Sequence, residues 1–388
     1  MKALKQAELK LWVYGGDILN HPNDPNYLLT KVVPSIEVAN RLANPDIPKS
    51  VIVFEISELI KDYVTIEFDG NYNALVQTKW VRTAVRRTYV EADGTETSDT
   101  TVKYGIAFRG YGNIAEGINP ELSKDLMISN TVINNKCGSF ITAPFYTTSE
   151  DGVARVDYFQ NQTQLDLNPP VGNISQFTIA QEVKIDSAVD DVITIDKTFS
   201  VTASPDDSIS TEEIPVDANR ITYTDSSGVS RSIDIKCIDD CKYDAQKVSF
   251  INKFGVMQDM WFFAKRTDSM SSQRESYRST KLDISNIASY KVSDHENSYL
   301  ENQGKERFTM NTGFIHESYG EVVKELLVSE YVYMYDVNRF SPSGGYSNLA
   351  VPVSIASSNV DIKTRLNDKL IEYTLEFEAD SDFIQSVR

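Results

Sequence analysis

The chain has 388 residues, 41 % of them apolar and 24 % charged, with a formal net charge of −18 and an isoelectric point near 4.7. This length exceeds a typical single hydrophobic core and predicts two or three domains. The acidity argues against direct binding to nucleic acid, because neutralising phosphates needs clustered Lys and Arg. No apolar run approaches the roughly 20 residues of a membrane span, so we expect no membrane insertion.

The first residues lack the uninterrupted apolar segment of a secretory signal, since Gln6, Glu8 and Lys10 break it. We therefore expect synthesis in a cytoplasm. Among the three cysteines, Cys237 and Cys241 would lie about 13 Å apart in a strand, too far for a disulfide. Two thiolates also fall short of a structural zinc site. The prediction is that the cysteines are reduced.

Residues 1–150 predict an N-terminal β domain with one short helix. Alternating polar and apolar residues indicate strands, and Asp93-Gly94 marks a hairpin loop between two of them. Ser57 is the expected cap of a short helix that runs to Tyr63. The expected strands include residues 8–14, 27–33, 78–89 and 101–108.

Residues 151–236 differ in composition, because Asp, Ser, Thr and Val dominate there. Short strands are expected at residues 190–196 and 199–202, and a hairpin is expected to join residues 221–224 to residues 232–235. This pattern predicts an acidic β insertion, a middle domain between the two outer ones.

Residues 237–388 predict a C-terminal β domain, whose clearest feature is an aromatic hairpin at residues 247–265. Two strand-like runs flank a turn at residues 252–255. Rings at this density must lie in a core or against another subunit, and we favour the core, because aromatic residues on paired strands usually pack within a domain. The candidates for such core or interface positions are Phe250, Phe254, Met260, Trp261, Phe262, Phe263, Trp12 and Trp80.

Beyond this hairpin, residues 267–301 are polar and Ser-rich, and we expect a long excursion from the domain. Residues 317–333 have apolar side chains at helical spacing, which predicts an amphipathic helix. Two strands follow, at residues 349–355 and 371–378. The expected fold class is mainly β, a multi-domain β-sandwich-like architecture with two short-to-medium helices packed on the sheets.

No catalytic arrangement stands out in the sequence. The chain has three isolated histidines, without a nucleophile motif or metal-ligand spacing beside them, at His21, His295 and His316. Gly110 and Gly112 resemble part of a dinucleotide-binding loop, but Ala115 occupies the position of its third glycine, so we expect a bulge or tight turn there. We therefore predict no enzyme, no catalytic residue, no cofactor and no metal ion.

Four segments resemble virion structural proteins of tailed bacteriophages, in particular phages of Bacteroidota hosts. They cover about a fifth of the chain and are spread from one end to the other. The segments are VFEISELIKDYV at residues 53–64, CKYDAQKVSFINKFGVMQDMWFF at 241–263, NTGFIHESYGEVVKELLVSE at 311–330 and LNDKLIEYTLEFE at 366–378.

The resemblance implies stacked β domains that assemble into rings or tail-tip complexes of a virion, in its tail, baseplate or neck. It implies a non-enzymatic homo-oligomer that contacts other virion structural proteins and is assembled in the host cytoplasm. High acidity would keep the protomers soluble until they meet. The alternative is an adhesin module of the virion that binds a receptor or a host-surface glycan through exposed rings and loops. A polysaccharide-cleaving enzyme ranks last.

Overall fold

The computed structural model of the chain describes residues 3–14, 27–37, 52–68, 70, 78–91, 93–112, 115, 126–137, 139–147, 153–160, 163–164, 171–181, 213–215, 218–225, 228–238, 242–278, 282–283, 289–290, 293, 295–335, 350–357, 360 and 370–381. These residues form 23 strands and two helices, so the prediction of a mainly-β fold is confirmed. Their contacts divide the chain into two compact units, Met1–Asp239 with Phe250–Asp259, and Asp240–Ser249 with Met260–Arg388.

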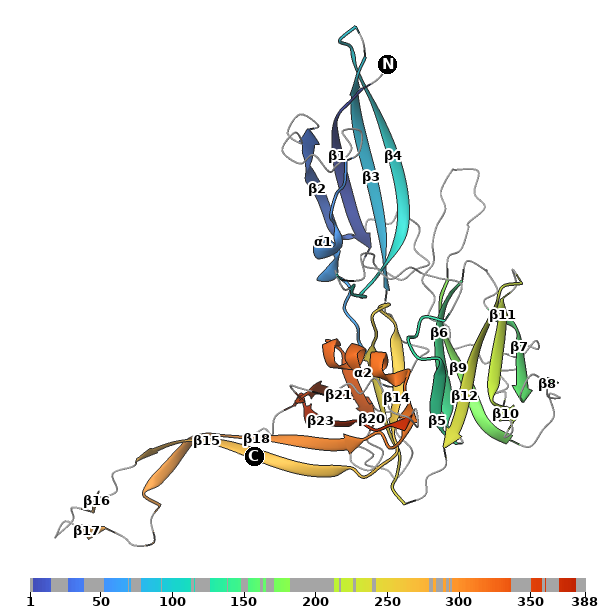
Figure 1. The fold of residues 1–388 in the computed structure, drawn as a ribbon. Coiled ribbons are helices and arrows are strands. Elements are labelled where there is room, and N and C mark those ends of the chain that lie inside the picture. Colours follow the sequence, from blue (N-terminus) through green and yellow to red (C-terminus); the bar gives the residue numbers. More distant parts are fainter. Residues whose placement is uncertain are drawn as a thin grey trace. The chain divides into compact units, whose positions relative to one another are not determined.

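The first unit begins with a four-stranded antiparallel sheet in the order β2-β1-β3-β4 (Figure 1). Its strands are β1 (Ala3–Tyr14), β2 (Tyr27–Glu37), β3 (Thr78–Val90) and β4 (Glu96–Phe108). Leu9, Leu11 and Val13 are buried, and this alternation marks the inward face of β1. The β3–β4 turn lies where a hairpin loop is predicted, and the Glu91 N–H donates to the Thr95 carbonyl across it.

Helix α1 (Ser57–Lys61) packs against this sheet, where Ile60 joins a cluster of apolar side chains from β1 and β3. The N-cap residue is Ile56, so the prediction that Ser57 caps the helix is wrong. The hydroxyl and the N–H of Ser57 donate to the carboxylate of Glu55 instead. These hydrogen bonds, that from the hydroxyl above all, lower the pKa of Glu55.

Two further sheets complete the first unit, one in the order β5-β12-β11-β7-β8 and one in the order β10-β9-β6. β5 pairs with β12, and β6 with β9, in parallel, whereas the other pairs are antiparallel. The strands are β5 (Val132–Lys136), β6 (Phe140–Thr147), β7 (Val153–Gln160), β8 (Thr163–Gln164), β9 (Val171–Gln181), β10 (Glu213–Pro215), β11 (Arg220–Asp225) and β12 (Ser230–Ile238).

The two parallel pairs cross the domain boundary expected at residue 150. β5 and β6 precede that boundary, while their partners β12 and β9 follow it. The contacts accordingly place the described parts of residues 1–150 and 151–236 in one unit. The hairpin of β11 and β12 forms where the sequence predicts it. The runs expected at residues 190–196 and 199–202 lie outside the described residues.

The second unit is built on a seven-stranded sheet in the order β14-β13-β20-β21-β23-β18-β15. Helix α2 (Tyr319–Val328) confirms the predicted amphipathic helix, because Val322, Val323 and Leu326 are buried along one face. It ends before the predicted residue 333, since residues 332–335 form a strand. The strands are β13 (Gln246–Ile251), β14 (Met257–Phe262), β15 (Thr267–Arg278), β18 (Asn297–Asn311), β20 (Val332–Tyr335), β21 (Ala350–Ile355) and β23 (Thr374–Ala379). Two short pairs accompany the sheet, β16 (Leu282–Asp283) with β17 (Ser289–Tyr290) and β19 (Ile315–His316) with β22 (Leu370–Ile371).

Strands β13 and β14 form the predicted aromatic hairpin, whose tip, Phe250–Asp259, clusters with the first unit. The Asn252 N–H donates to the Val256 carbonyl at 3.0 Å and closes the turn. Gly255 has φ +82°, a conformation that favours glycine. The turn therefore forms at residues 252–255, as the sequence predicts.

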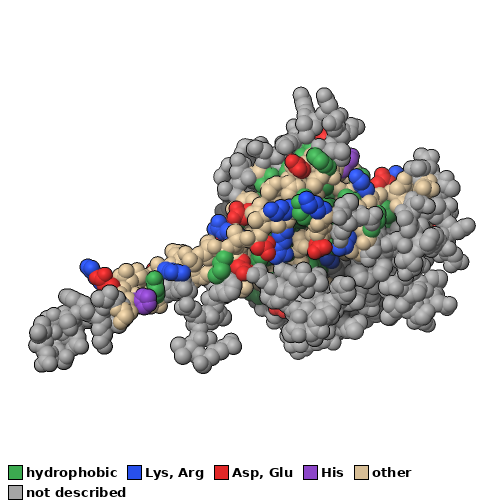
Figure 2. Space-filling view, turned by 90° about the horizontal axis from the view of Figure 1, so that it is seen from below, with side chains coloured by type: hydrophobic (Ala, Val, Ile, Leu, Met, Phe, Trp, Pro, Cys, Tyr) green, Lys and Arg blue, Asp and Glu red, His purple; other side chains and the backbone are tan. Residues whose placement is uncertain are grey.

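Strands β15 and β18 continue past their neighbours as a two-stranded antiparallel ribbon (Figure 1). β18 pairs with β23 only over residues 307–311, whereas it pairs with β15 over residues 297–309. Every residue of β15 is exposed, and Figure 2 shows mainly uncharged polar side chains and backbone along the ribbon. The excursion expected at residues 267–301 is thus a β-ribbon in its described residues 267–278 and 297–301. Its sequence lacks apolar alternation because neither face of β15 is buried.

Candidate functional site

Three of the candidate core or interface residues lie in the core. Phe250, Met260 and Phe262 are exposed by no more than 1 %. The ring of Phe262 meets Phe377 of β23 edge to face, with the centroids 5.6 Å apart. These side chains fix the hairpin within the chain and are closed to a partner.

Three further hairpin candidates are half-buried. Trp261 and Phe263 point to the other side of β14 and stack on each other, with ring centroids 6.4 Å apart and 24° between the planes. The ring of Phe254, in the turn, lies 5.4 Å from the ammonium of Lys253. The hairpin therefore keeps an aromatic surface that is partly open to water.

The two remaining candidates belong to the N-terminal sheet. Trp12 is half-buried, and its ring centroid lies 4.8 Å from Lys10 Nζ and 4.6 Å from the Arg82 guanidinium. These cations cover the ring, so it belongs to the local packing of the sheet. Trp80 lies in β3 opposite Ile106, and its side chain lies outside the described residues.

A buried network of amide side chains holds the hairpin tip. Asn252 donates to the Met127 carbonyl at 2.7 Å and to Gln258 Oε1 at 3.0 Å. Its Oδ1 accepts two N–H groups of its own turn, at 3.0 and 3.3 Å. Gln258 in turn donates to Asn130 Oδ1 at 3.0 Å. This network satisfies polar groups that are closed to water and orients the tip.

Gly110 and Gly255 let two backbone segments approach each other. A Cβ on Gly110 would lie 2.5 Å from the Lys253 carbonyl oxygen, and one on Gly255 would lie 2.6 Å from the Gly110 nitrogen. The Tyr111 N–H donates to the Lys253 carbonyl at 2.9 Å within this contact. Close backbone approach therefore explains Gly110.

A cavity of about 610 Å3 lies beside this contact, lined by α1, residues 107–112 and the hairpin turn. Arg109 contributes to its wall, but its guanidinium donates to the carbonyls of Lys61 at 3.1 Å and Val64 at 2.9 Å. Lys61 ends α1, and its carbonyl also accepts the Val64 N–H at 3.3 Å, whereas Val64 lies just beyond the helix. Arg109 thus holds the helix to the sheet.

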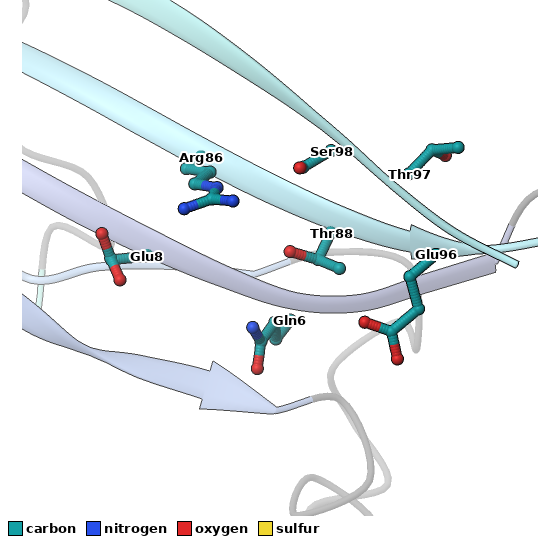
Figure 3. A pocket seen from close by; sticks show the side chains of 7 residues that line it. All are labelled: Gln6, Glu8, Arg86, Thr88, Glu96, Thr97 and Ser98. Atoms are coloured by element: carbon teal, nitrogen blue, oxygen red, sulfur yellow. The ribbon is translucent and has the colours of Figure 1, made fainter.

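A second, polar hollow of about 210 Å3 lies over β1, β3 and β4 (Figure 3). Glu8 faces Arg86 directly across the β1–β3 pair, and Glu96 forms an ion pair with Lys5 at 2.5 Å. Such groups can hydrogen-bond a small polar molecule. None of the seven lining residues is aromatic, so the hollow lacks a surface on which a sugar ring would stack. They are Gln6, Glu8, Arg86, Thr88, Glu96, Thr97 and Ser98.

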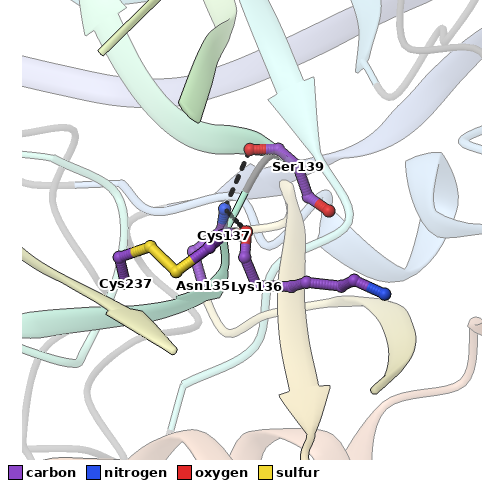
Figure 4. The surroundings of a disulfide bond; sticks show 5 residues. All are labelled: Asn135, Lys136, Cys137, Ser139 and Cys237. Atoms are coloured by element: carbon purple, nitrogen blue, oxygen red, sulfur yellow. Dashed lines mark hydrogen bonds between the residues drawn. A yellow bond between two sulfur atoms is a disulfide. The ribbon is translucent and has the colours of Figure 1, made fainter. Parts of the chain in front are cut away.

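A disulfide joins Cys137 and Cys237, with 5.1 Å between the Cα atoms (Figure 4). Cys237 lies in β12, and Cys137 directly follows the parallel strand β5. The Cys137 N–H donates to the Ile238 carbonyl at 3.1 Å and continues this pairing. The prediction of reduced cysteines is therefore wrong for this pair. Sequence reasoning considered only neighbouring cysteines, and these lie 100 residues apart.

An ion-pair cluster fixes the base of the β15–β18 ribbon. Glu378 of β23, whose side chain is 16 % exposed, accepts hydrogen bonds from Lys305 at 3.0 Å and Arg307 at 2.9 Å. Both cations belong to β18. The Lys305 hydrogen bond first, and then that of Arg307, lower the pKa of Glu378. These ion pairs therefore hold β18 to β23 at the point where the ribbon extends beyond the sheet.

Large apolar side chains are exposed on the ribbon itself. Tyr277, Tyr299 and Leu300 are 48 %, 58 % and 71 % exposed near its outer part, and Met270 is 59 % exposed. Leu300 is the extra residue of a β-bulge, because Glu275 pairs with Glu301 and the next residue of β15 with Tyr299. Sequence reasoning passed over this surface because its residues are separated by polar ones.

The described residues hold no group of three His, Cys, Asp or Glu side chains placed to bind a metal ion. Of the histidines, His316 accepts the Ser318 N–H at 3.2 Å just before α2, and His21 lies outside the described residues. No helix in the described part is long and apolar enough to cross a bilayer.

No protein-family model and no curated protein matches this sequence. The function is therefore inferred from the residues of the chain itself.

Proposed function

We propose that the chain is a non-enzymatic structural component of a tailed-phage particle, in its tail, baseplate or neck. It works as a homo-oligomer that also contacts other virion proteins. The observation that carries this proposal is the β15–β18 ribbon, whose strand β15 is exposed along its whole length. An isolated two-stranded ribbon is marginally stable in water, so a partner that covers it completes its stabilisation.

The partly open stack of Trp261 and Phe263 supports the same proposal. Amphipathic rings are common in contacts between subunits, where they bury a large area at low cost in side-chain entropy. A net charge of −18 keeps separate protomers soluble until such surfaces meet.

The four segments that resemble phage virion proteins belong to both units. Residues 53–64 include α1, and residues 241–263 include the aromatic hairpin. Residues 311–330 include α2, and residues 366–378 include β22 and most of β23. The resemblance thus concerns elements that define the fold, which supports a shared architecture.

The Cys137–Cys237 disulfide also fits a virion protein. A chain that is assembled in the reducing cytoplasm of a host keeps its thiols, and oxygen outside the cell takes two electrons and two protons from them when the particle is released. The crosslink then stabilises the first unit outside the cell, where no chaperone rescues an unfolded chain.

The alternative of a glycan-binding adhesin draws on the polar hollow over β1, β3 and β4. Its carboxylates and Arg86 can accept and donate hydrogen bonds to hydroxyl groups. Its lack of an aromatic lining residue favours the structural role.

Native mass spectrometry and electron micrographs of the purified chain over a range of concentrations test the proposal. We expect a discrete homo-oligomer, and we expect the chain on the axis of purified particles. A strict monomer that is absent from particles would contradict it. Binding to a glycan array with a peripheral position would support the adhesin, and release of reducing ends from host capsule would reveal an enzyme.

A further inference from the structure

We propose that the outer edge of β15 pairs with β15 of a second copy, antiparallel and about a two-fold axis at Gln273. This inference deepens the homo-oligomer proposal, on which it rests, by naming the contact. Two ribbons then join into one four-stranded sheet that spans both copies.

The edge is open and long enough for such pairing. β15 is the last strand of its sheet, and within the described residues its backbone pairs with β18 alone. Half of the N–H and C=O groups of a 12-residue strand point to that edge, where no other described strand pairs with them. Pairing replaces water with regular hydrogen bonds and turns a marginal ribbon into a four-stranded sheet.

Symmetry limits the registers that two copies can adopt. A two-fold axis perpendicular to a sheet leaves every side chain on its own face, and directly opposite residues share a face. One residue must therefore lie opposite its own copy. The longest overlaps that satisfy this rule cover eleven residues of β15 and place either Ser272 or Gln273 on the axis.

Charge selects between these registers. With Gln273 on the axis, Asp268 of each copy lies opposite Arg278 of the other, Glu275 lies opposite Ser271, and no like charges meet. With Ser272 on the axis, no ion pair forms and Arg278 faces Arg266 just beyond the strand. A shift that centres Arg274 or Glu275 places identical charges opposite each other.

Asp268 and Arg278, which the Gln273 register pairs between copies, already have ion-pair partners within the single chain. In the single chain, Asp268 pairs with Arg266 at 2.7 Å, and Arg278 pairs with Glu296. Arg278 and Glu296 have side chains more than half exposed, and an exposed pair of this kind contributes little to stability. Asp268 is also more than half exposed, but its partner Arg266 is 17 % exposed and donates to both of its carboxylate oxygens. Arg278 can therefore leave Glu296 at little cost and approach Asp268 of the second copy, which stays paired with its own Arg266.

The overall charge of the ribbon also favours a second copy as partner. Residues 267–309 contain six Lys and Arg and seven Asp and Glu, a net charge of −1, which leaves −17 for the rest of the chain. Two nearly neutral ribbons meet without the repulsion that other surfaces of two acidic copies experience. The bulge at Leu300 lies on β18, so the outer strand β15 stays regular.

Cysteine substitution tests the register directly. In Gln273→Cys the two thiols face each other across the axis, whereas in Ser271→Cys each thiol faces Glu275 and lies about 13 Å from its copy. Under mild oxidation we expect a covalent dimer of Gln273→Cys and at least about tenfold less of Ser271→Cys, with the linked peptide identified by mass. Equal yields, or a Ser271→Cys dimer in place of the Gln273→Cys dimer, would overturn the register.

A shortened ribbon tests the contact and separates it from the proposed function. A two-residue Asn-Gly turn replaces Ser272 through Gly304 and joins the paired residues Ser271 and Lys305, so the anchor to Glu378 remains. We expect self-association in sedimentation to weaken by at least about a hundredfold. A shortened chain that assembles like the full chain would overturn the ribbon contact and leave the structural role standing. A full chain that crosslinks through Gln273→Cys but is absent from particles would leave the contact standing and overturn the role.

Discussion

Glycine and asparagine decide the geometry of the hairpin tip at the scale of single residues. Position 255 requires glycine for two reasons. Its φ is +82°, and a Cβ there would lie only 2.6 Å from the Gly110 nitrogen. Gly228 has almost the same φ, +83°, but nothing within 4 Å of its missing Cβ. Substitution of Gly228 therefore measures backbone strain alone, whereas substitution of Gly255 measures the strain together with the steric contact.

We expect Gly255→Ala to destabilise the chain by at least about 2 kcal/mol more than Gly228→Ala. Both variants carry the strain of a left-handed alanine, about 1 kcal/mol, but only the first forces two backbone segments apart. Urea unfolding followed by circular dichroism measures both. Equal losses would show that the Gly110–Gly255 approach has no energetic role.

We expect Asn252→Ala to lower the free energy of unfolding by about 2–4 kcal/mol. The change removes two donated and two accepted hydrogen bonds from a site closed to water. The matched control is Asn311→Ala, because Asn311 also accepts an N–H two residues on, at 2.7 Å, but is half exposed. Its loss should stay near 1 kcal/mol, and similar losses for both would argue against a special role for burial.

At the scale of elements, the β15–β18 ribbon is held to its sheet by an ion-pair cluster as well as by strand pairing. The ribbon buries little, so its attachment depends on β18 continuing into the sheet beside β23. Glu378 binds Lys305 and Arg307 at this junction. The carboxylate is mostly shielded from water, which makes the cluster stronger than an exposed pair.

We expect Glu378→Gln to lower stability by about 1 kcal/mol at pH 7, and by progressively less as the pH falls below the ordinary pKa of glutamate. The pKa of Glu378 is lowered in the folded state, so its contribution is present above the ordinary pKa of glutamate. It is lost as the pH falls through the folded value. Thermal unfolding across this range measures the effect, with Glu376→Gln as the control, since Glu376 lies 3.5 Å from Arg307 and is more exposed. A loss that does not depend on pH would contradict the assignment.

At the scale of the whole molecule, long-range links hold the first unit together. The parallel pairs of β5 with β12 and of β6 with β9 join segments that the sequence assigns to different domains. The disulfide between Cys137 and Cys237 closes a loop with a sequence separation of 100 residues at the same place.

We expect Cys137→Ser to lower the stability of the oxidised chain by about 4 kcal/mol. The crosslink restricts the unfolded chain, and the effect grows with the length of the loop it closes. Wild type in dithiothreitol should match the variant, and the variant itself should not respond to the reductant. An oxidised wild type with the intact mass of the fully reduced chain would contradict the pairing.

The sequence by itself determined those features of this protein that depend on neighbours along the chain. The turns at residues 93–94 and 252–255 follow from glycine and asparagine, and α2 follows from apolar residues at helical spacing, because these rules act within a few residues. The mainly-β class follows from the same local alternation.

Only the tertiary structure decided what depends on distant segments. It brought Gly110 to the hairpin turn and Cys137 to Cys237, and it showed a ribbon where residues 267–301 display no alternation. Local patterns record which side of a strand is buried, but not which segment buries it. A strand with both faces in water, such as β15, leaves no such pattern. The form of the ribbon, and the self-contact inferred from it, therefore emerge only when the paired strands are seen together.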